Sequence, residues 1–231
     1  MFDREYLIIG DKINILKQSN ILLVGLGGVG GYTLESLARS GIESFTIVDF
    51  DKVDITNTNR QLIAIEPNYG LYKTDCWENR LKQINKNIKI NKITEFLDEN
   101  NINKIINKDT KYNFIIDCID SVNSKKLLIE ESIKYNIPII SSMGTGNKID
   151  PSLLKINKLK KTETCPLARK MRSLLRDNKE ALEIPVLYST EKVIKNEDIN
   201  HHVGSISYLP AISGLLISSY VIRKIIGDLN E

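Results

Sequence analysis

The chain has 231 residues, 42% of them hydrophobic and 26% charged, with a formal net charge of +3. This balance is typical of a globular protein that buries its own core, and it excludes a disordered, collagenous or coiled-coil chain. The three cysteines form no C-x-x-C pair. We therefore expect neither a disulfide framework nor a structural zinc site, and we expect a reducing compartment, the cytoplasm. The first residues carry no basic segment followed by an apolar one, so no secretory signal is expected.

Apolar runs alternate with helical patterns over the first two thirds of the chain. The expected strands are residues 21–24, 45–48, 88–93, 114–116 and 137–140, and the expected helices are 29–40, 70–84 and 125–135. Strands that alternate with helices predict a Rossmann-like α/β fold, in which a mostly parallel sheet carries helices on both faces.

The pattern changes after Asp150. Expected strands at 154–159 and 184–188 follow, together with expected helices at 166–176 and 208–226. We expect one domain over 1–231, with a core of about 20–150 and a C-terminal α+β extension of about 151–231.

The expected helix 208–226 is apolar enough to raise the question of a membrane. It contains Pro210, several serines and the pair Arg223-Lys224. By the usual length and charge criteria these residues favour a buried or subunit-interface helix over a membrane span.

A glycine-rich loop follows the first expected strand and opens a helix. Its glycines are Gly25, Gly27, Gly28 and Gly30. Glycines let the backbone approach a phosphate closely, and the free N–H groups of a helix N-terminus bind anions. The second expected strand ends at Asp49, 19 residues beyond Gly30, where a carboxylate can receive ribose hydroxyls. This context predicts a nucleotide site, without distinguishing NAD from ATP.

The residues after Asp49 favour a triphosphate, because a guanidinium holds phosphate oxygens in pairs while amides orient them. The candidates are Asp51, Asn57, Asn59, Arg60 and Gln61, followed by Lys73 as a point charge for the same phosphates. Asp120 and Ser121 follow the expected strand 114–116. Because carboxyl ends of parallel strands face the ligand crevice, Asp120 is a candidate Mg²⁺ ligand and Ser121 a candidate nucleotide contact.

Positive charge is concentrated in residues 151–179, which hold nine basic and two acidic residues, a net charge of +7. The rest of the chain has 23 basic and 27 acidic residues, a net charge of −4. Three arginines of the expected helix recur at intervals of three and four, so they share a face. A basic face is typical of phosphate binding and equally of a solvated surface. The candidate RNA-binding residues are Lys160, Lys161, Arg169, Arg172 and Arg176.

Together these motifs resemble the ubiquitin-activating-type adenylyltransferase superfamily. The motifs are Gly25-x-Gly-Gly-x-Gly30, Asp49-x-Asp51, Asp54-Ile-Thr-Asn-Thr-Asn-Arg-Gln61, Lys73, Asp117-x-x-Asp120 and Pro185-Val-Leu-Tyr-Ser-Thr-Glu191. Within this superfamily the chain looks most like the tRNA threonylcarbamoyladenosine dehydratases. The resemblance implies an enzyme that uses ATP and Mg²⁺ to adenylate the carboxylate of threonylcarbamoyladenosine 37 in tRNA. Ring closure then releases AMP, after pyrophosphate has left.

The same resemblance implies roles for individual residues. Asp49 is expected to hold the ribose, and Asn57, Arg60 and Lys73 are expected to bind the triphosphate. Asp120 is the expected Mg²⁺ ligand. Arg4 matches an arginine that reaches into the neighbouring subunit's site, which implies a homodimer with sites completed in trans. Arg4, Arg60, Lys73 and Asp120 are thus the expected catalytic residues.

Three alternatives remain at this point. The first is an adenylyltransferase that activates the C-terminus of a ubiquitin-like sulfur-carrier protein. The paired C-x-x-C motifs with which those enzymes usually bind zinc are absent from this sequence, which weakens that reading. The second is an NAD-dependent oxidoreductase, and the third is a nucleotide-sensing scaffold without chemistry.

Overall fold

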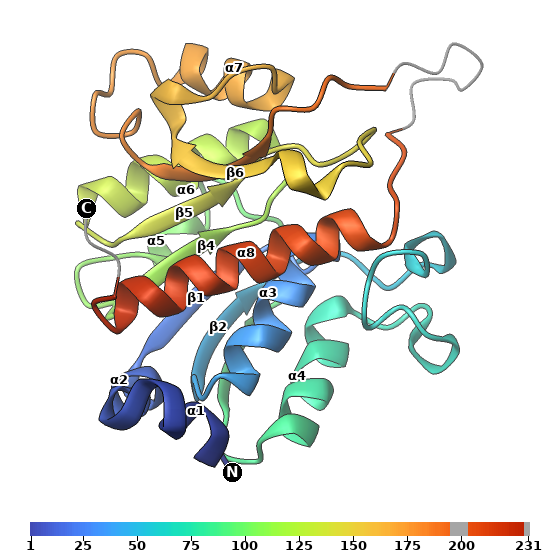
Figure 1. Ribbon diagram of the computed structural model, residues 1–231, viewed down its shortest axis with the longest axis vertical. Coiled ribbons are helices and arrows are strands. Elements are labelled where there is room, and N and C mark those ends of the chain that lie inside the picture. The colour runs from blue at the N-terminus through green and yellow to red at the C-terminus, as the bar shows by residue number, and fades with distance from the viewer. Residues whose placement is uncertain (195–202, 229–231) are drawn as a thin grey trace.

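The computed structural model describes residues 1–194 and 203–228 (Figure 1). Its centre is a seven-stranded sheet in the order β3-β2-β1-β4-β5-β7-β6. All neighbouring strands run parallel except β6, which pairs with β7 in the antiparallel direction. The strands are β1 (Asn20–Val24), β2 (Ser44–Val48), β3 (Lys89–Ile93), β4 (Phe114–Asp117), β5 (Ile139–Ser142), β6 (Leu154–Lys158) and β7 (Pro185–Ser189).

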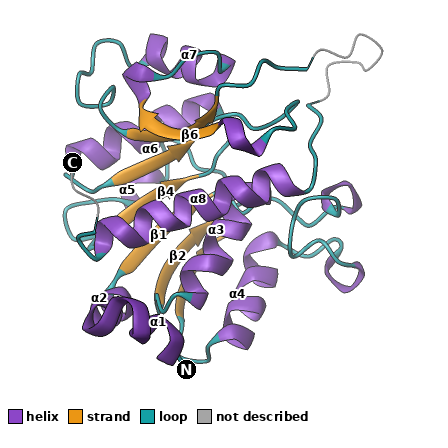
Figure 2. Ribbon diagram, viewed as in Figure 1, coloured by secondary structure: helices purple, strands orange, loops and turns teal. Residues whose placement is uncertain are grey.

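Helices cover both faces of this sheet (Figure 2). They are α1 (Asp3–Ile9), α2 (Ile13–Gln18), α3 (Gly28–Arg39), α4 (Lys73–Ile84), α5 (Ile102–Ile105), α6 (Val122–Lys134), α7 (Pro166–Leu174) and α8 (Tyr208–Ile225). The expected Rossmann-like fold is therefore confirmed. The C-terminal strands β6 and β7 extend the same sheet as the core.

The strand β1 shows why the core divides into two layers. Its residues alternate between the two faces because side chains of a strand point up and down in turn. Ile21 and Leu23 pack with α3, α4 and α8, whereas Leu22 and Val24 pack with α5, α6 and α7. A strand covered on both faces has no polar side, which explains its continuous apolar run.

The helix α8 is packed against α3 rather than left exposed, as the sequence predicted. A Cβ at Gly214 would lie 2.5 Å from the carbonyl oxygen of Val29. Thr33 Oγ1 donates to the carbonyl of Gly214 at 3.1 Å, and a hydrogen bond of 2.8 Å joins Ser218 to Ser36. Small residues thus let the two backbones approach closely. None of the described helices is long and apolar enough to cross a membrane.

Some predicted helix boundaries need correction, and some helices were not predicted. The helix expected from residue 70 begins only at Lys73, because Tyr72 is extended and forms an isolated bridge with Lys52. The helix expected over 166–176 ends at Leu174, so Arg176 lies beyond it and does not share its face. The helices of residues 3–18 and the short α5 were not expected at all.

Candidate nucleotide-binding site

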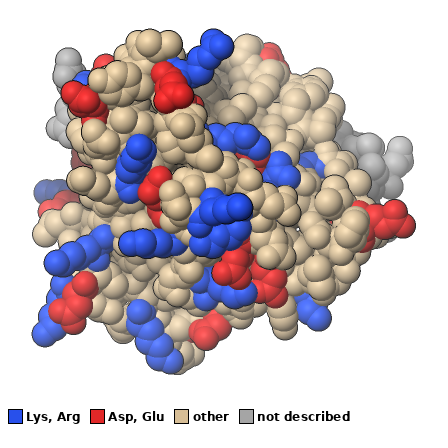
Figure 3. Space-filling view, turned by 90° about the horizontal axis from the view of Figure 1, so that it is seen from below, with Lys and Arg blue, Asp and Glu red and all other residues tan. Residues whose placement is uncertain are grey.

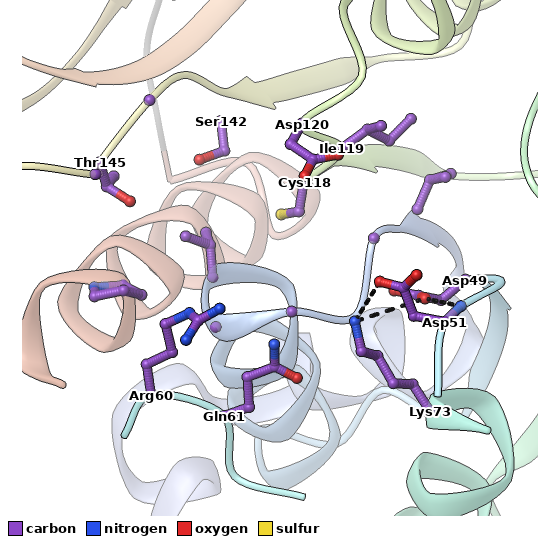
Figure 4. A pocket seen from close by; sticks show the side chains of 18 of the residues that line it. Asp49, Asp51, Arg60, Gln61, Lys73, Cys118, Ile119, Asp120, Ser142 and Thr145 are labelled. Atoms are coloured by element: carbon purple, nitrogen blue, oxygen red, sulfur yellow. Dashed lines mark hydrogen bonds and ion pairs between the residues drawn. The ribbon is translucent and has the colours of Figure 1, made fainter. Parts of the chain in front are cut away.

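A cavity of about 530 Å³ opens at the carboxyl ends of the parallel strands. Its walls are the glycine loop, the residues that follow β2, β4 and β5, and residues 203–205 ahead of α8. Figure 4 shows Arg60 and Gln61 on one side of it and Ser142, Thr145 and Asp120 across from them. Residues far apart in the sequence thus meet here, as expected for the edge where parallel strands end.

The glycine loop is folded tightly against the residues after β4. Gly25 has φ +93°, and a Cβ there would lie 2.5 Å from the carbonyl oxygen of Cys118. Gly27 and Gly28 line the cavity. Gly30 does not line it, and a Cβ at Gly30 would overlap the carbonyl oxygen of Gly25. Gly30 therefore allows the turn itself, while the earlier glycines leave the backbone open to a ligand.

The buried carboxylate of Asp49 braces this loop. Its Oδ2 accepts a hydrogen bond of 2.6 Å from the N–H of Leu26, and its Oδ1 accepts one of 2.9 Å from the N–H of Asp51. The ammonium of Lys73 lies 2.7 Å from Asp51 Oδ2 and 4.0 Å from Asp49 Oδ1. These three side chains line the cavity together.

Burial sets the electrostatics of this cluster. Desolvation raises the pKa of Asp49, while the nearby Lys73 and the two backbone N–H groups oppose that rise. The pKa of this carboxyl therefore lies above its ordinary value. A buried carboxylate beside a lysine is suited to accept hydroxyl hydrogen bonds from a ligand.

The turn that carries Arg60 is held by local hydrogen bonds. Asp54 Oδ1 accepts a 2.8 Å hydrogen bond from the N–H of Thr56, and Asn57 Oδ1 accepts one of 3.2 Å from the N–H of Asp54. Such reciprocal capping fixes the turn. Nη1 of Arg60 donates to the carbonyl of Thr56 and to Oδ1 of Asn59, both at 2.9 Å. The guanidinium is thereby held at the cavity wall.

The amides of this segment differ in position. Asn57 and Gln61 line the cavity, and Oε1 of Gln61 is buried with no hydrogen-bond partner among residues 1–194 and 203–228. A buried acceptor without a partner is costly unless a ligand or water satisfies it. Asn59 does not line the cavity, and its Nδ2 donates to the carbonyl of Ser205 at 2.9 Å.

Asp120 is exposed and lines the cavity beside the glycine loop. Its loop is anchored by the N–H of Ile119, which donates to Oδ1 of Asp117 at 3.1 Å. Mg²⁺ is commonly held by one or two carboxylates together with substrate phosphates, so a single aspartate at this position fits the ion. Ser121 precedes α6, accepts a hydrogen bond from Ser124 and does not line the cavity. Residues 1–194 and 203–228 contain no cluster of three potential metal ligands.

Several residues of the cavity were not among the site residues predicted from the sequence. Phe50 and Phe96 form an edge-to-face pair with centroids 5.1 Å apart at the cavity wall. Residues 142–146 form another part of that wall. Lys148, which follows them, is buried and donates to the carbonyls of Gly144 and Ser189. It therefore supports the loop and does not line the cavity.

The remaining predicted residues lie away from the cavity. Arg4 is exposed on α1, at the end of the molecule marked N in Figure 1. Lys160 is paired with Glu183, and Arg172 donates to the carbonyl of Thr162 at 2.9 Å. The exposed members of the candidate RNA-binding set are Lys160, Lys161, Arg169 and Arg176. The adjacent His201 and His202, whose spacing in the sequence does not suit metal binding, lie outside the described residues.

Comparison with known proteins places this geometry in a family. The sequence matches the ThiF family over residues 2–231. The chain belongs to the ThiF family. A tRNA threonylcarbamoyladenosine dehydratase of Bacillus subtilis is 33% identical over 99% of this chain and 95% of its own. The enzyme of that name from Escherichia coli is 31% identical over 80% of this chain and 71% of its own.

Solved structures agree with this assignment. The Escherichia coli dehydratase TcdA in complex with ATP superposes on this ThiF-family chain with a TM-score of 0.90 and 31% identity. That match covers 98% of this chain and 93% of TcdA. The molybdopterin-synthase adenylyltransferase of Haemophilus influenzae is 37% identical over only 39% of this chain and 37% of its own.

Proposed function

We propose that this protein is an ATP-dependent tRNA threonylcarbamoyladenosine dehydratase. The observation that carries the proposal is a single cavity lined by the glycine loop, Arg60, Lys73 and Asp120. Relatives of that name match this chain over most of its length, and one of them has been solved with ATP.

The reaction has two steps. The carboxylate of the threonylcarbamoyl group attacks the α-phosphate of ATP, giving an acyl-adenylate and pyrophosphate. The carbamoyl group of the same side chain then attacks the acyl carbon, a proton is lost and AMP leaves. No enzyme nucleophile is needed, because the second nucleophile is tethered beside the acyl carbon at high effective molarity.

The protein's main contribution is to stabilise negative charge on the phosphates. Arg60 and Lys73 supply positive charge at the cavity wall, and the N-terminus of α3 supplies backbone N–H groups. Mg²⁺ bound at Asp120 would add Lewis-acid charge at the same phosphates. In this proposal Asp49 accepts the ribose hydroxyls, and Phe50 with Phe96, which line the same cavity, offers an apolar wall to the base.

An exposed apolar helix supports a homodimer. No residue of α1 is buried, and the side chains of Leu7 and Ile8 are 81% and 86% exposed. Arg4 lies three and four positions before them, on the same face of the helix. Because exposed apolar surface of this kind is typical of protein interfaces, docking α1 on a second copy would carry Arg4 to that copy. We infer that each site is completed in trans by Arg4.

Residues 151–179, with a net charge of +7, are the proposed tRNA contact. Figure 3, the view from below, shows Lys and Arg interspersed with Asp and Glu on the opposite side of the molecule from α7. A mixed surface of that kind is less suited to a polyanion than the basic segment. Because the substrate is tRNA, we place the reaction in the cytoplasm.

The test is mass spectrometry of nucleosides from a tRNA that carries threonylcarbamoyladenosine, after incubation with protein, ATP and Mg²⁺. We expect that nucleoside to lose the mass of one water. Arg60→Ala should abolish the product, and Arg223→Ala, an arginine at the far end of α8, should not. A protein that leaves the nucleoside unchanged, yet releases pyrophosphate when given a carrier ending in Gly-Gly, would be a carrier adenylyltransferase instead.

A further inference from the structure

Two asparagines fasten the segment ahead of α8 to the wall of the nucleotide cavity. Asn147 pairs with Gly204 through two hydrogen bonds. The N–H of Asn147 donates to the carbonyl of Gly204 at 2.9 Å, and the N–H of Gly204 donates to Asn147 Oδ1 at 2.5 Å. Beside this pair a Cβ at Gly146 would overlap the side chain of Val203. Backbone groups of the two segments therefore bond directly, and the side chain of Val203 lies against the backbone of Gly146.

Asn147 is specialised for this contact. Its φ is +56°, a region where asparagine is strongly favoured over most side chains. Its carbonyl also accepts a 2.9 Å hydrogen bond from the N–H of Ile194. Asn147 thus joins Ile194 and Gly204, which lie ten positions apart in the chain.

Asn59 makes the second attachment from the opposite side. Its Nδ2 donates to the carbonyl of Ser205, while its Oδ1 accepts from Arg60, both at 2.9 Å. A side-chain amide can do both at once because it carries a donor and an acceptor on separate atoms. Asn59 thus connects the segment directly to the guanidinium at the proposed triphosphate site. A further hydrogen bond, from Tyr208 Oη to the carbonyl of Ile149 at 2.8 Å, holds the start of α8.

The segment held by these hydrogen bonds forms part of the cavity wall. Val203, Gly204 and Ser205 line it together with Arg60 and Asp120. An acyl-adenylate formed there is a mixed anhydride that water can attack in place of the carbamoyl group. Closed sites protect such intermediates by excluding water.

We propose that Asn147 and Asn59 are positioning residues that hold Val203–Ser205 as the wall that shields the acyl-adenylate from water. This inference rests on the proposed dehydratase function. In the protected reaction the carbamoyl group bonds to the acyl carbon, and AMP leaves with one ring formed. In the unprotected reaction a water oxygen bonds to that carbon, and AMP leaves while the original carboxylate and a proton are regenerated. If this wall is lost, more AMP is therefore released for each ring that is closed.

The experiment measures initial rates of AMP release and of cyclic nucleoside formation with the same tRNA. Asn147→Gly keeps the left-handed backbone but removes the Oδ1 acceptor, whereas Asn147→Asp keeps both. We expect about one AMP per ring for the wild-type protein. For Asn147→Gly we expect the AMP released in excess of rings closed to rise about fivefold, as one lost hydrogen bond predicts. Asn147→Asp should restore the wild-type ratio.

Asn136→Gly is the matched control. Asn136 also has a positive φ, of +54°, but follows α6 and does not line the cavity. Its variant should keep the wild-type ratio, because a general loss of stability does not change how the intermediate partitions.

Asn59→Asp tests the second attachment from a different part of the chain. It keeps the acceptor for Arg60 and loses the donor to Ser205. We expect a raised AMP-to-ring ratio while the KM for ATP stays within about twofold, because Arg60 keeps its partner. A wild-type AMP-to-ring ratio in both Asn147→Gly and Asn59→Asp would overturn the proposal that Val203–Ser205 shield the acyl-adenylate from water. Wild-type protein that forms no ring would contradict the proposed function, and this inference with it.

Discussion

Lys125 and Asp117 form an ion pair that is closed off from solvent, with Nζ 2.8 Å from Oδ2 and both side chains 0% exposed. Ser141 Oγ donates to the same carboxylate oxygen at 2.5 Å, and Lys125 also donates to the carbonyl of Ser142 at 2.9 Å. The other oxygen of Asp117 accepts from the N–H of Ile119. The pair therefore fixes both segments that lead into the cavity, one after β4 and one after β5.

Removing one partner of this pair should be costly. We expect Lys125→Met to lower the free energy of unfolding by about 3–5 kcal/mol, because Asp117 would remain as an uncompensated buried charge. Urea denaturation measures the change. Lys134→Met, which removes an exposed partner of Glu131, should cost at most about 1 kcal/mol. A double variant Asp117→Asn with Lys125→Met should cost less than the two single variants together, and simple additivity would refute the coupling.

The raised pKa of Asp49 predicts a pH dependence of adenosine binding. Adenosine is the suitable ligand because it carries no phosphate that titrates. Protonation removes the carboxylate proposed to accept ribose hydroxyls, so adenosine affinity should fall on acidification. The fall should begin at a higher pH than for an ordinary carboxyl. Calorimetric titration at a series of pH values gives the midpoint.

The same measurement on Lys73→Met tests how Lys73 affects the pKa of Asp49. Lys73 lowers the pKa of Asp49, so its loss should move the midpoint of the affinity curve to higher pH. Lys92→Met removes a lysine paired with Asp75 and Glu78 on the surface and should leave the midpoint where it is. A midpoint that moves downward in Lys73→Met would contradict the assignment of the titration to Asp49.

Mixing two inactive variants tests whether Arg4 acts in trans. Arg4→Ala and Arg60→Ala should each be inactive as homodimers. After mixing, half of the dimers are heterodimers with one intact site, so about a quarter of the wild-type activity should return. Leu7→Asp should disrupt the dimer and prevent this recovery, which light scattering and activity assays would show together. Two variants that stay inactive after verified subunit exchange would rule out completion in trans.

The structure indicates which arginine of the proposed tRNA surface is free to contact tRNA. Arg169 is exposed, whereas Arg172 is half-buried and bonded to Thr162. Arg169→Glu should therefore weaken tRNA binding and reduce its salt dependence while ATP affinity stays the same. Filter binding over a range of salt concentrations measures the tRNA affinity and its salt dependence. Lys108→Glu makes the same charge change at an exposed residue outside the basic segment, and an equal effect there would show that only net charge matters.

Much of the fold and part of the candidate site could be predicted from the sequence alone. The alternation of strands and helices determined the parallel sheet, because each element's own apolar pattern reveals which faces it buries. The position of Asp49, Arg60 and Asp120 relative to their strands then placed all three at one edge, where the structure shows them lining one cavity. These inferences work because they use short-range patterns and one general rule about parallel sheets.

Only the tertiary structure decided the partners of individual side chains. Asn59 stands in the same motif as Asn57 and Arg60, yet its donor is used by Ser205, 146 residues away. Lys125 looks like an ordinary helix-surface lysine in the sequence, yet it is buried against Asp117. Such pairings depend on how α8 and the segments after β4 and β5 come together in space. No local pattern of residues carries that information.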